Sequence, residues 1–128
     1  MPDFTIRDLE RRVKERARAS PTASYTRKLI DQGVAHCARK LGEEAVEAAL
    51  AAVSEDRQRL IAEASDLIYH LLVLLEARGI ALAEVEAELA ERARQSGLEE
   101  KALRKRRRSQ APLSRRSVKA GSRSARSA

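Results

Sequence analysis

Hydrophobic residues recur every three to four positions along most of residues 1–100, which is the spacing of amphipathic α-helices. No stretch alternates cleanly between polar and apolar residues, and β-branched residues are sparse, so the pattern predicts no strands. The expected fold class is therefore all-α, a small antiparallel bundle of four to five helices.

The first helix is expected to begin after Thr5 and to run to about Ala19. Thr5 and Asp8 have the spacing of a capping box, in which two side chains bond free backbone groups at the start of a helix. Residues 20–21 are Ser-Pro, and the residue before a proline disfavours helical geometry, so the helix stops there. A second helix is expected to begin after Ser24, a good N-cap residue.

The two longest helices are expected in the middle of the chain. Residues 31–33, Asp-Gln-Gly, interrupt the helical pattern, and a long helix then covers about 34–53. The polar turn 54–56 separates it from another helix over about 57–78, which stops at Gly79, a natural C-cap. A connection of three residues forces these two helices to be antiparallel neighbours.

A final amphipathic helix is predicted over residues 81–95. From Arg104 onward the chain is rich in Arg, Ser, Ala and Lys and has no apolar periodicity, so it cannot bury enough surface to offset the entropy of ordering. The sequence thus predicts a helical domain over 1–103 and a disordered basic tail over 104–128.

The charges are unevenly distributed between these two parts. All 19 Asp and Glu residues lie within 1–100, whereas 11 of the 26 Lys and Arg residues lie within 101–128, so the two segments carry net charges of −4 and +11. The tail is expected to bind polyanions incidentally, because it can release counterions but has no aromatic residues for base stacking.

The size and composition of the helical part also bear on its assembly and location. About 100 residues with almost no aromatic side chains make a thin core, so we expect subunit association to complete the bundle. The single Cys37 excludes an intrachain disulfide and is typical of a reducing compartment. The longest apolar run, 67–75, is too short to span a bilayer, and no signal peptide is visible. A cytoplasmic protein without a membrane partner is expected.

Two blocks of carboxylates carry the candidate chemistry. Glu43, Glu44 and Glu47 read E-E-x-x-E, and Glu63 and Asp66 read E-x-x-D, both within alanine- and leucine-rich helical stretches. Acids on apolar helix faces repel one another and resist desolvation, and a divalent cation removes both problems. Oxygen ligands alone are typical of magnesium or manganese, and hence of phosphate chemistry. Either block alone is more typical of a solvated surface.

Several neighbouring residues have two possible roles. His70 is expected to be a packed histidine of the bundle interior, with orientation of a carboxylate or substrate contact as the alternative. Ser24 and Thr26 either cap the second helix or contact substrate. His36 is either an exposed helix residue or a phosphate contact.

Three segments resemble a known family. Ser24–Thr26, Lys40–Glu47 and Glu63–Leu75, with Gly33 between the first two, are similar to the phosphoribosyl-ATP pyrophosphatases of histidine biosynthesis. The acidic signature is shared by all-α nucleoside triphosphate pyrophosphatases in general, whereas D-L-I-Y-H-L-L-V-L-L is the discriminating stretch.

The resemblance implies a helical homodimer that uses Mg²⁺, with Mn²⁺ as a substitute, to cleave the nucleotide phosphoribosyl-ATP into phosphoribosyl-AMP and pyrophosphate. It implies that the metal ligands are Glu43, Glu44, Glu47, Glu63 and Asp66. Glu44 and Glu47 are the catalytic candidates, and Glu44 could accept the proton of water in place of binding metal. The expected substrate contacts are Lys40, Arg39, His36, Ser24 and Thr26.

One departure from the family concerns the phosphate contacts. Many members have a basic pair where this chain has Ala35-His36, and Arg39 and Lys40 are expected to compensate. Two other functions remain open at this point. One is a house-cleaning pyrophosphatase for non-standard nucleotides, and the other is a non-enzymatic helical dimer that binds nucleic acid through its tail.

Overall fold

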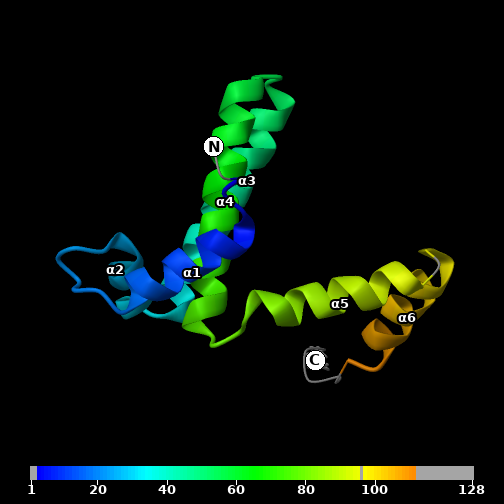
Figure 1. Cartoon of the computed structure of the whole chain (residues 1–128). Coiled ribbons are helices and arrows are strands. Elements are labelled where there is room, and N and C mark those ends of the chain that lie inside the picture. The colour runs from blue at the N-terminus through cyan, green and yellow to red at the C-terminus, as the bar shows by residue number, and fades with distance from the viewer. Residues whose placement is uncertain (1–2, 96, 112–128) are drawn as a thin grey trace, which may run out of the picture. The chain divides into compact units, whose positions relative to one another are not determined.

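The computed structural model describes residues 3–95 and 97–111, and all of its regular structure is helical, with no strand in the described residues. Figure 1 shows the elements along the chain. Six helices are present: α1 (Ile6–Ala17), α2 (Tyr25–Asp31), α3 (Val34–Val53), α4 (Arg57–Ala77), α5 (Leu82–Arg94) and α6 (Gly97–Ser109). The chain divides into two compact units, one ending at Leu89 and one beginning at Ala90.

The N-terminal caps follow the sequence prediction. The Thr5 side chain accepts from the Asp8 amide at the start of α1, and the Thr5 amide donates to Asp8 Oδ2 at 2.8 Å, which completes the capping box. The Ser24 hydroxyl caps α2 by accepting from the Arg27 amide at 3.1 Å. Both helices therefore begin at the residues that the sequence indicated.

Helices α3 and α4 form an antiparallel hairpin, which has the most extensive helix contact in the structure (Figure 1). They are joined by Ser54–Asp56, where Glu55 has a positive φ of 60° and Asp56 caps α4 by accepting from the Arg59 amide at 3.1 Å. The three-residue turn predicted from the sequence is confirmed. It fixes the register in which the two acidic blocks face each other.

A left-handed glycine ends α4. Gly79 has φ of 67°, and the Ile80 amide donates to the Leu75 carbonyl at 2.9 Å, so the last carbonyls of the helix are satisfied. The first turn of α5 is then held to α1 through the Leu82 amide, which donates to Glu10 Oε2 at 2.6 Å. An ion pair between Arg7 and Glu86 joins the same two helices.

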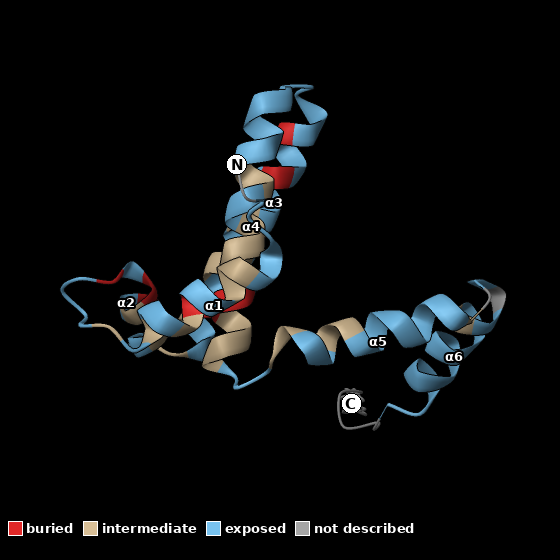
Figure 2. Ribbon diagram, in the orientation of Figure 1, coloured by how far each residue is buried: buried red, intermediate tan, exposed pale blue. Residues whose placement is uncertain are grey.

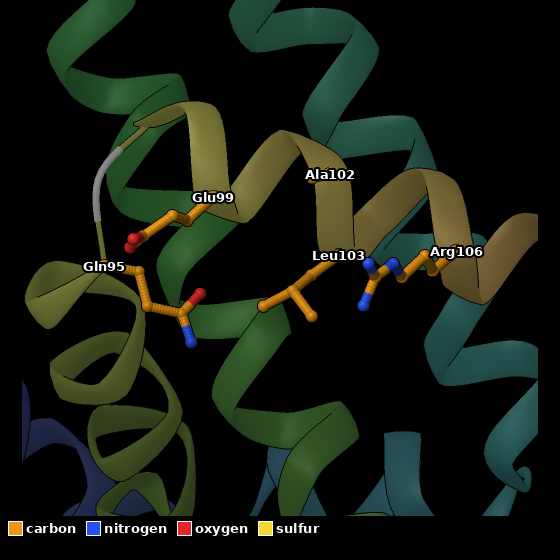
Figure 3. Close-up of a pocket in the computed structure, with 5 residues that line it drawn as sticks. All are labelled: Gln95, Glu99, Ala102, Leu103 and Arg106. Carbon is orange, nitrogen blue, oxygen red and sulfur yellow. The ribbon is translucent and has the colours of Figure 1, made fainter.

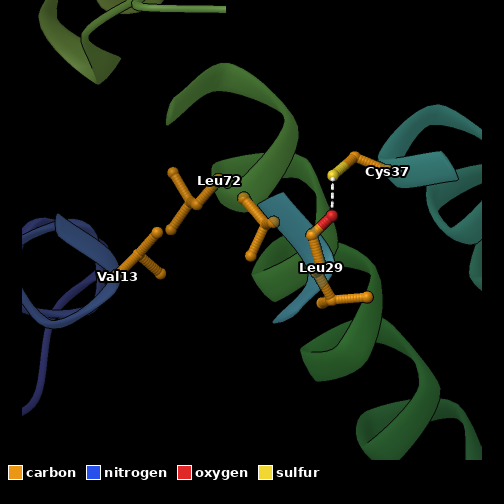
Figure 4. Close-up of a cluster of buried hydrophobic side chains, with 5 residues drawn as sticks. Val13, Leu29, Cys37 and Leu72 are labelled. Atoms are coloured by element: carbon orange, nitrogen blue, oxygen red, sulfur yellow. Dashed lines mark hydrogen bonds between the residues drawn. The ribbon is translucent and has the colours of Figure 1, made fainter. Parts of the chain in front are cut away.

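The core of the first unit gathers a few side chains from four helices. Val13 of α1, Leu29 of α2, Cys37 of α3, and Leu72 and Val73 of α4 form one buried cluster. Figure 4 draws the cluster and labels four of its members, with the Cys37 thiol donating to the Leu29 carbonyl at 3.2 Å. The cluster sits at the end of the hairpin opposite its turn, where α2 packs against α3 and α4 and where α1 packs against α4.

The far half of the hairpin is mostly exposed (Figure 2). Its buried residues are two small ones, Ala48 and Ala51, on the face of α3 that meets α4. Large apolar side chains remain on the outside of this half: Val46, Leu50, Val53, Leu60 and Ile61.

Helix α6 was not predicted, so the expected count of four to five helices is exceeded in the described residues. The helix runs through Arg104 to Ser109, where the sequence predicted the start of a disordered tail. Glu99 and Glu100 in its first turn and arginines in its last turn complement the helix dipole, and Glu100 also pairs with Arg104. These local interactions stabilise α6, although its sequence lacks apolar periodicity.

The second unit contains a pocket beside α6, formed by Gln95, Glu99, Ala102, Leu103 and Arg106 (Figure 3). It contains none of the residues predicted for the site. The remainder of the predicted tail, 112–128, lies outside the described residues. Among the residues that are described, no helix has both the length and the apolar character needed to cross a membrane.

Candidate metal centre

The α3–α4 hairpin brings three of the five predicted acids together. Glu44 of α3 and Glu63 and Asp66 of α4 each place a carboxylate oxygen within 4.8 Å of the others. Glu44 and Glu63 are half-buried and Asp66 is exposed, so the cluster opens to solvent on one side. We call Glu44, Glu63 and Asp66 the acidic trio.

The packing faces of the two helices explain this convergence. Glu44 lies two turns after Cys37 and one turn before Ala48 on the face of α3 that α4 covers, and Glu63 and Asp66 precede the buried His70 on α4. Side chains three, four or seven positions apart share a helix face. The small Ala48 lets the two backbones approach, so carboxylates from both helices meet.

Electrostatic repulsion is visible at Glu63. Desolvation by burial raises the pKa of the Glu63 carboxyl group, and the negative charges of Glu47, Glu44 and Asp66 raise it further, whereas Arg59 lowers it. A carboxyl group among like charges is stabilised by a cation. The negative charge of the trio is therefore not fully compensated by cationic side chains of the protein.

Glu43 and Glu47, the other two predicted ligands, make ion pairs beside the trio. Glu43 lies 3.5 Å from Lys40 Nζ and 3.9 Å from Arg39 Nε, all on α3. Glu47 accepts a hydrogen bond from Arg59 Nη2 of α4 at 3.2 Å. The structure thus places them at the edge of the cluster, and their role as metal ligands stays a prediction.

His70 is buried beside the trio, with Nε2 3.9 Å from Glu44 Oε1. Desolvation lowers the pKa of its imidazole, and so does the charge of Lys40, while Asp66 and Glu43 act in the opposite direction. A lowered pKa leaves the ring neutral at pH 7. The expectation of a packed histidine agrees with this burial, and its edge-on contacts with Tyr25 and Tyr69 complete the packing.

Ser24 and Thr26 are buried and hydrogen-bonded within the protein. Besides capping α2, the Ser24 hydroxyl donates to the Arg16 carbonyl at 2.8 Å. Thr26 Oγ1 lies 2.6 Å from the Tyr69 hydroxyl. These bonds are the capping and packing roles considered from the sequence, and contact with substrate stays a prediction for both residues.

The predicted phosphate contacts on α3 lie on the solvent side of the same helix. Arg39 Nη2 lies 3.1 Å from His36 Nδ1, and both Arg39 and Lys40 lean toward Glu43 as described above. Lys40 is half-buried and Arg39 exposed, so both side chains can reach an anion without disrupting the core.

Two residues near the site were not predicted from the sequence to belong to it. Arg59 faces Glu47 across the hairpin, and Tyr25 packs its ring 6.5 Å from that of His70. Arg59 could have been found from its position four residues before Glu63, which places both on one face of α4. No sequence signal would have placed Tyr25, because its position depends on how α2 packs.

The donor chemistry of the trio fits Mg²⁺ or Mn²⁺. Octahedral magnesium binds oxygens at about 2.0–2.1 Å, so adjacent oxygens are about 2.9 Å apart and opposite ones about 4.2 Å apart. The trio has oxygens within 4.8 Å of one another, so small side-chain rotations would bring them to these distances. Three carboxylates would leave coordination positions for water and phosphate oxygens.

Comparison with known proteins decides the family. Residues 6–93 match the family model described as phosphoribosyl-ATP pyrophosphohydrolase, and this span contains the acidic trio, Glu43, Glu47 and His70. The chain belongs to the phosphoribosyl-ATP pyrophosphohydrolase family. The resemblance stated from three short segments is therefore confirmed over most of the chain.

Individual members of the phosphoribosyl-ATP pyrophosphohydrolase family are closely similar. Phosphoribosyl-ATP pyrophosphatase 1 of Bradyrhizobium diazoefficiens is 62% identical over 105 residues, which cover 82% of this chain and 99% of the relative. Phosphoribosyl-ATP pyrophosphatase of Azorhizobium caulinodans is 62% identical over 102 residues, covering 80% of this chain and 94% of the relative. That of Rhizobium meliloti is 53% identical over 104 residues, covering 81% and 97%.

Proposed function

We propose that this chain is a metal-dependent phosphoribosyl-ATP diphosphatase, which hydrolyses the α–β phosphate linkage and releases phosphoribosyl-AMP and pyrophosphate in the second step of histidine biosynthesis. The observation that carries the proposal is the convergence of Glu44, Glu63 and Asp66 in a member of this family. The names of the close relatives support the substrate.

The acidic trio is proposed to hold Mg²⁺, or Mn²⁺ in its place, with Glu43 as an additional ligand once substrate neutralises the present partners of its carboxylate. When bound, the metal would polarise the phosphate linkage and lower the pKa of a coordinated water. Lys40 and Arg39 would bind phosphate oxygens, since both already lie beside a carboxylate of the site. His36 would orient Arg39 through the contact between their side chains.

Glu47 is proposed to accept the proton of the attacking water. Of the two catalytic candidates, Glu44 belongs to the trio and is better suited to bind metal, whereas Glu47 lies outside it. Glu47 is still close enough to raise the pKa of Glu63, so it faces the same space. A proton acceptor must be within hydrogen-bond reach of the water and free of the metal.

A pair of substitutions separates these roles. Glu47→Gln is expected to abolish turnover while Mn²⁺ binding is largely kept, and Glu44→Gln is expected to lose both. The measurements are pyrophosphate release from phosphoribosyl-ATP and equilibrium Mn²⁺ binding followed by electron paramagnetic resonance. Equal loss of Mn²⁺ binding in both variants would assign Glu47 to the metal instead.

The substrate itself is tested on the unmodified chain. Pyrophosphate release is expected from phosphoribosyl-ATP with Mg²⁺, and not after the addition of EDTA. A house-cleaning enzyme would instead release pyrophosphate from free deoxynucleotides at comparable rates, and a non-enzymatic binding protein would release none. Complementation of a histidine auxotroph is the cellular test, and it would also support the proposed cytoplasmic location.

Homodimerisation is proposed through the far half of the α3–α4 hairpin. Val46, Leu50 and Val53 of α3 leave 58%, 54% and 83% of their surface exposed, and Leu60 and Ile61 of α4 are also exposed. Apolar side chains gathered in this way are typical of a protein interface. A Val46→Glu, Leu50→Glu double variant is expected to elute as a monomer in light-scattering measurements, where the wild type elutes as a dimer.

Incidental polyanion binding is proposed for the basic C-terminal segment. Lys101, Arg104, Lys105 and Arg108 of α6 line one surface pocket and share a helix face. Retention on heparin is expected to fall steeply with salt, as counterion release requires. Deletion of 104–128 is expected to reduce retention and to leave turnover unchanged.

A further inference from the structure

A pocket of the first unit, beside α1 and the start of α2, has a basic wall. It has a volume of about 380 Å³ and is lined by Arg12 and Arg16 of α1, Tyr25 and Thr26 at the start of α2, and Tyr69 of α4. We call it the arginine pocket. None of its charged residues belongs to the site described above.

The two arginines are available to an anion. Arg12 and Arg16 are four residues apart on α1, so their side chains share one face, and both are exposed. Within the part of the chain that the structure describes, neither forms an ion pair, and the guanidinium of Arg12 lies 5.7 Å from the centre of the Phe4 ring. By contrast, Arg7 and Arg11 of the same helix are paired with Glu86 and Asp8.

An apolar pocket connects the arginine pocket to the acidic trio. This connecting pocket, of about 420 Å³, shares Leu9 and Tyr69 with the arginine pocket and extends to Asp66. Its walls include Phe4, Ile6 and Ile68. The two pockets therefore share part of their walls, and the second one reaches Asp66 of the acidic trio.

A second set of contacts joins the same two regions from inside. Tyr25, which lines the arginine pocket, packs edge-on against His70, and His70 Nε2 lies 3.9 Å from Glu44. The hydroxyl of Tyr69, at the junction of the two pockets, is held by Thr26. Tyr25 and Tyr69 thus line the arginine pocket and also contact His70, which lies beside the trio.

This arrangement matches the chemistry of the proposed substrate. Phosphoribosyl-ATP has two anionic ends, the triphosphate and the phosphate of the added ribose, with an adenine between them. The trio with its metal would hold the triphosphate, an apolar depression suits a purine, and a pair of guanidinium groups binds a phosphate through charge-assisted hydrogen bonds.

We propose that the arginine pocket binds the 5-phosphate of the phosphoribosyl group, with Arg12 and Arg16 as the residues that distinguish phosphoribosyl-ATP from ATP. The proposal rests on the proposed function for the choice of substrate. It adds a specificity site on α1, outside the acidic signature that nucleotide pyrophosphatases share.

The test compares two ligands that differ only in the phosphoribosyl group. The full chain is titrated with phosphoribosyl-AMP and with AMP in the presence of Mg²⁺, and binding is followed by calorimetry. The wild type is expected to bind phosphoribosyl-AMP at least about tenfold more tightly, the effect of one or two hydrogen bonds to a charged group. The double variant Arg12→Ala, Arg16→Ala is expected to bind both ligands with similar affinity.

Three further variants make the result specific. Arg16→Ala alone avoids the contact between Arg12 and Phe4 and is expected to lose most of the preference, while Arg16→Lys is expected to keep part of it. Arg18→Ala is the matched control, because Arg18 is exposed at the end of α1 and lines neither pocket. Circular dichroism checks that each variant is folded.

The outcomes separate this proposal from the proposed function. No preference for phosphoribosyl-AMP in the wild type, or a preference that survives in the double variant, would overturn the assignment of the arginine pocket. A wild type that shows the preference but releases no pyrophosphate from phosphoribosyl-ATP would overturn the proposed function alone. In turnover, the double variant is expected to raise KM for phosphoribosyl-ATP at least about tenfold with kcat nearly unchanged.

Discussion

Arg59 of α4 donates a hydrogen bond across the hairpin to Glu47 of α3, with Nη2 and Oε2 3.2 Å apart. The two side chains belong to different helices of the hairpin, and about half of each is exposed to solvent. The pair therefore joins α3 to α4 at the edge of the candidate metal centre, and it is not part of the core.

Removal of this link is expected to affect catalysis more than stability. Arg59→Ala should change the free energy of unfolding by less than about 1 kcal/mol, the usual range for an exposed ion pair. It should lower kcat severalfold, because Glu47 loses the partner that orients it. Arg59→Lys, which keeps the charge, should be intermediate. A fall in stability of several kcal/mol with unchanged kcat would contradict this view.

Neutralising one acid of the trio is expected to remove turnover and leave the fold intact. In EDTA, Asp66→Asn should unfold at the same temperature as the wild type or slightly above it, since repulsion with Glu63 is relieved. Thermal melts followed by circular dichroism and a pyrophosphate-release assay measure both properties. The matched control is Asp31→Asn, which removes the exposed ion pair with Arg27 and should leave turnover unchanged.

The buried His70 predicts a loss of stability in acid. Its pKa is lowered in the folded state, so below about pH 6.5 the unfolded chain binds a proton that the folded chain resists. The free energy of unfolding should therefore decrease as pH falls through the unfolded pKa and level off below the folded one. His70→Gln should flatten this part of the profile in urea titrations between pH 7 and 5. The same substitution at the less buried His36 should leave it in place.

Replacement of Gly79 and of Gly42 by alanine should change the free energy of unfolding in opposite directions, although both glycines have free space around them. A methyl group added at either Gly79 or Gly42 would meet no atom within 4 Å, but Gly79 has φ of +67° and Gly42 lies inside α3. Gly79→Ala should lower the free energy of unfolding by about 1 kcal/mol, and Gly42→Ala should raise it by about 0.5–1 kcal/mol. Urea denaturation of both variants measures the difference. The same sign for both would mean that local packing dominates.

Most helices of the first unit could be predicted because nearby residues in the sequence determine where each helix begins and ends. Ser24, Gly33, the turn at 54–56 and Gly79 are each sufficient to start or end a helix, and the expected bounds of α3 and α4 lie within one residue of the observed ones. Helix α6 was not predicted because a glycine more often follows a helix, whereas Gly97 begins one that is stabilised by charge. Local electrostatics is harder to read than apolar periodicity.

The residue types of the site could be predicted from the sequence, but not which of the carboxylates come together. The E-E-x-x-E and E-x-x-D signatures indicated the carboxylates, and the short turn indicated that they face each other. The separation of Glu43 and Glu47 from the trio depends on the rotation of α3 and on the reach of Lys40 and Arg59. The arginine pocket depends on how α1 docks on α4, which no residue of α1 specifies by itself.

The three-residue connection between α3 and α4 has a consequence for how the protein folds. Glu44, Glu63 and Asp66 are separated by at most 22 positions along the chain, all within one hairpin. Closing so short a loop costs little entropy, and contacts of this kind form early and quickly. The three carboxylates can thus come together before α1 docks, so formation of the proposed metal site should be kinetically independent of formation of the proposed arginine pocket.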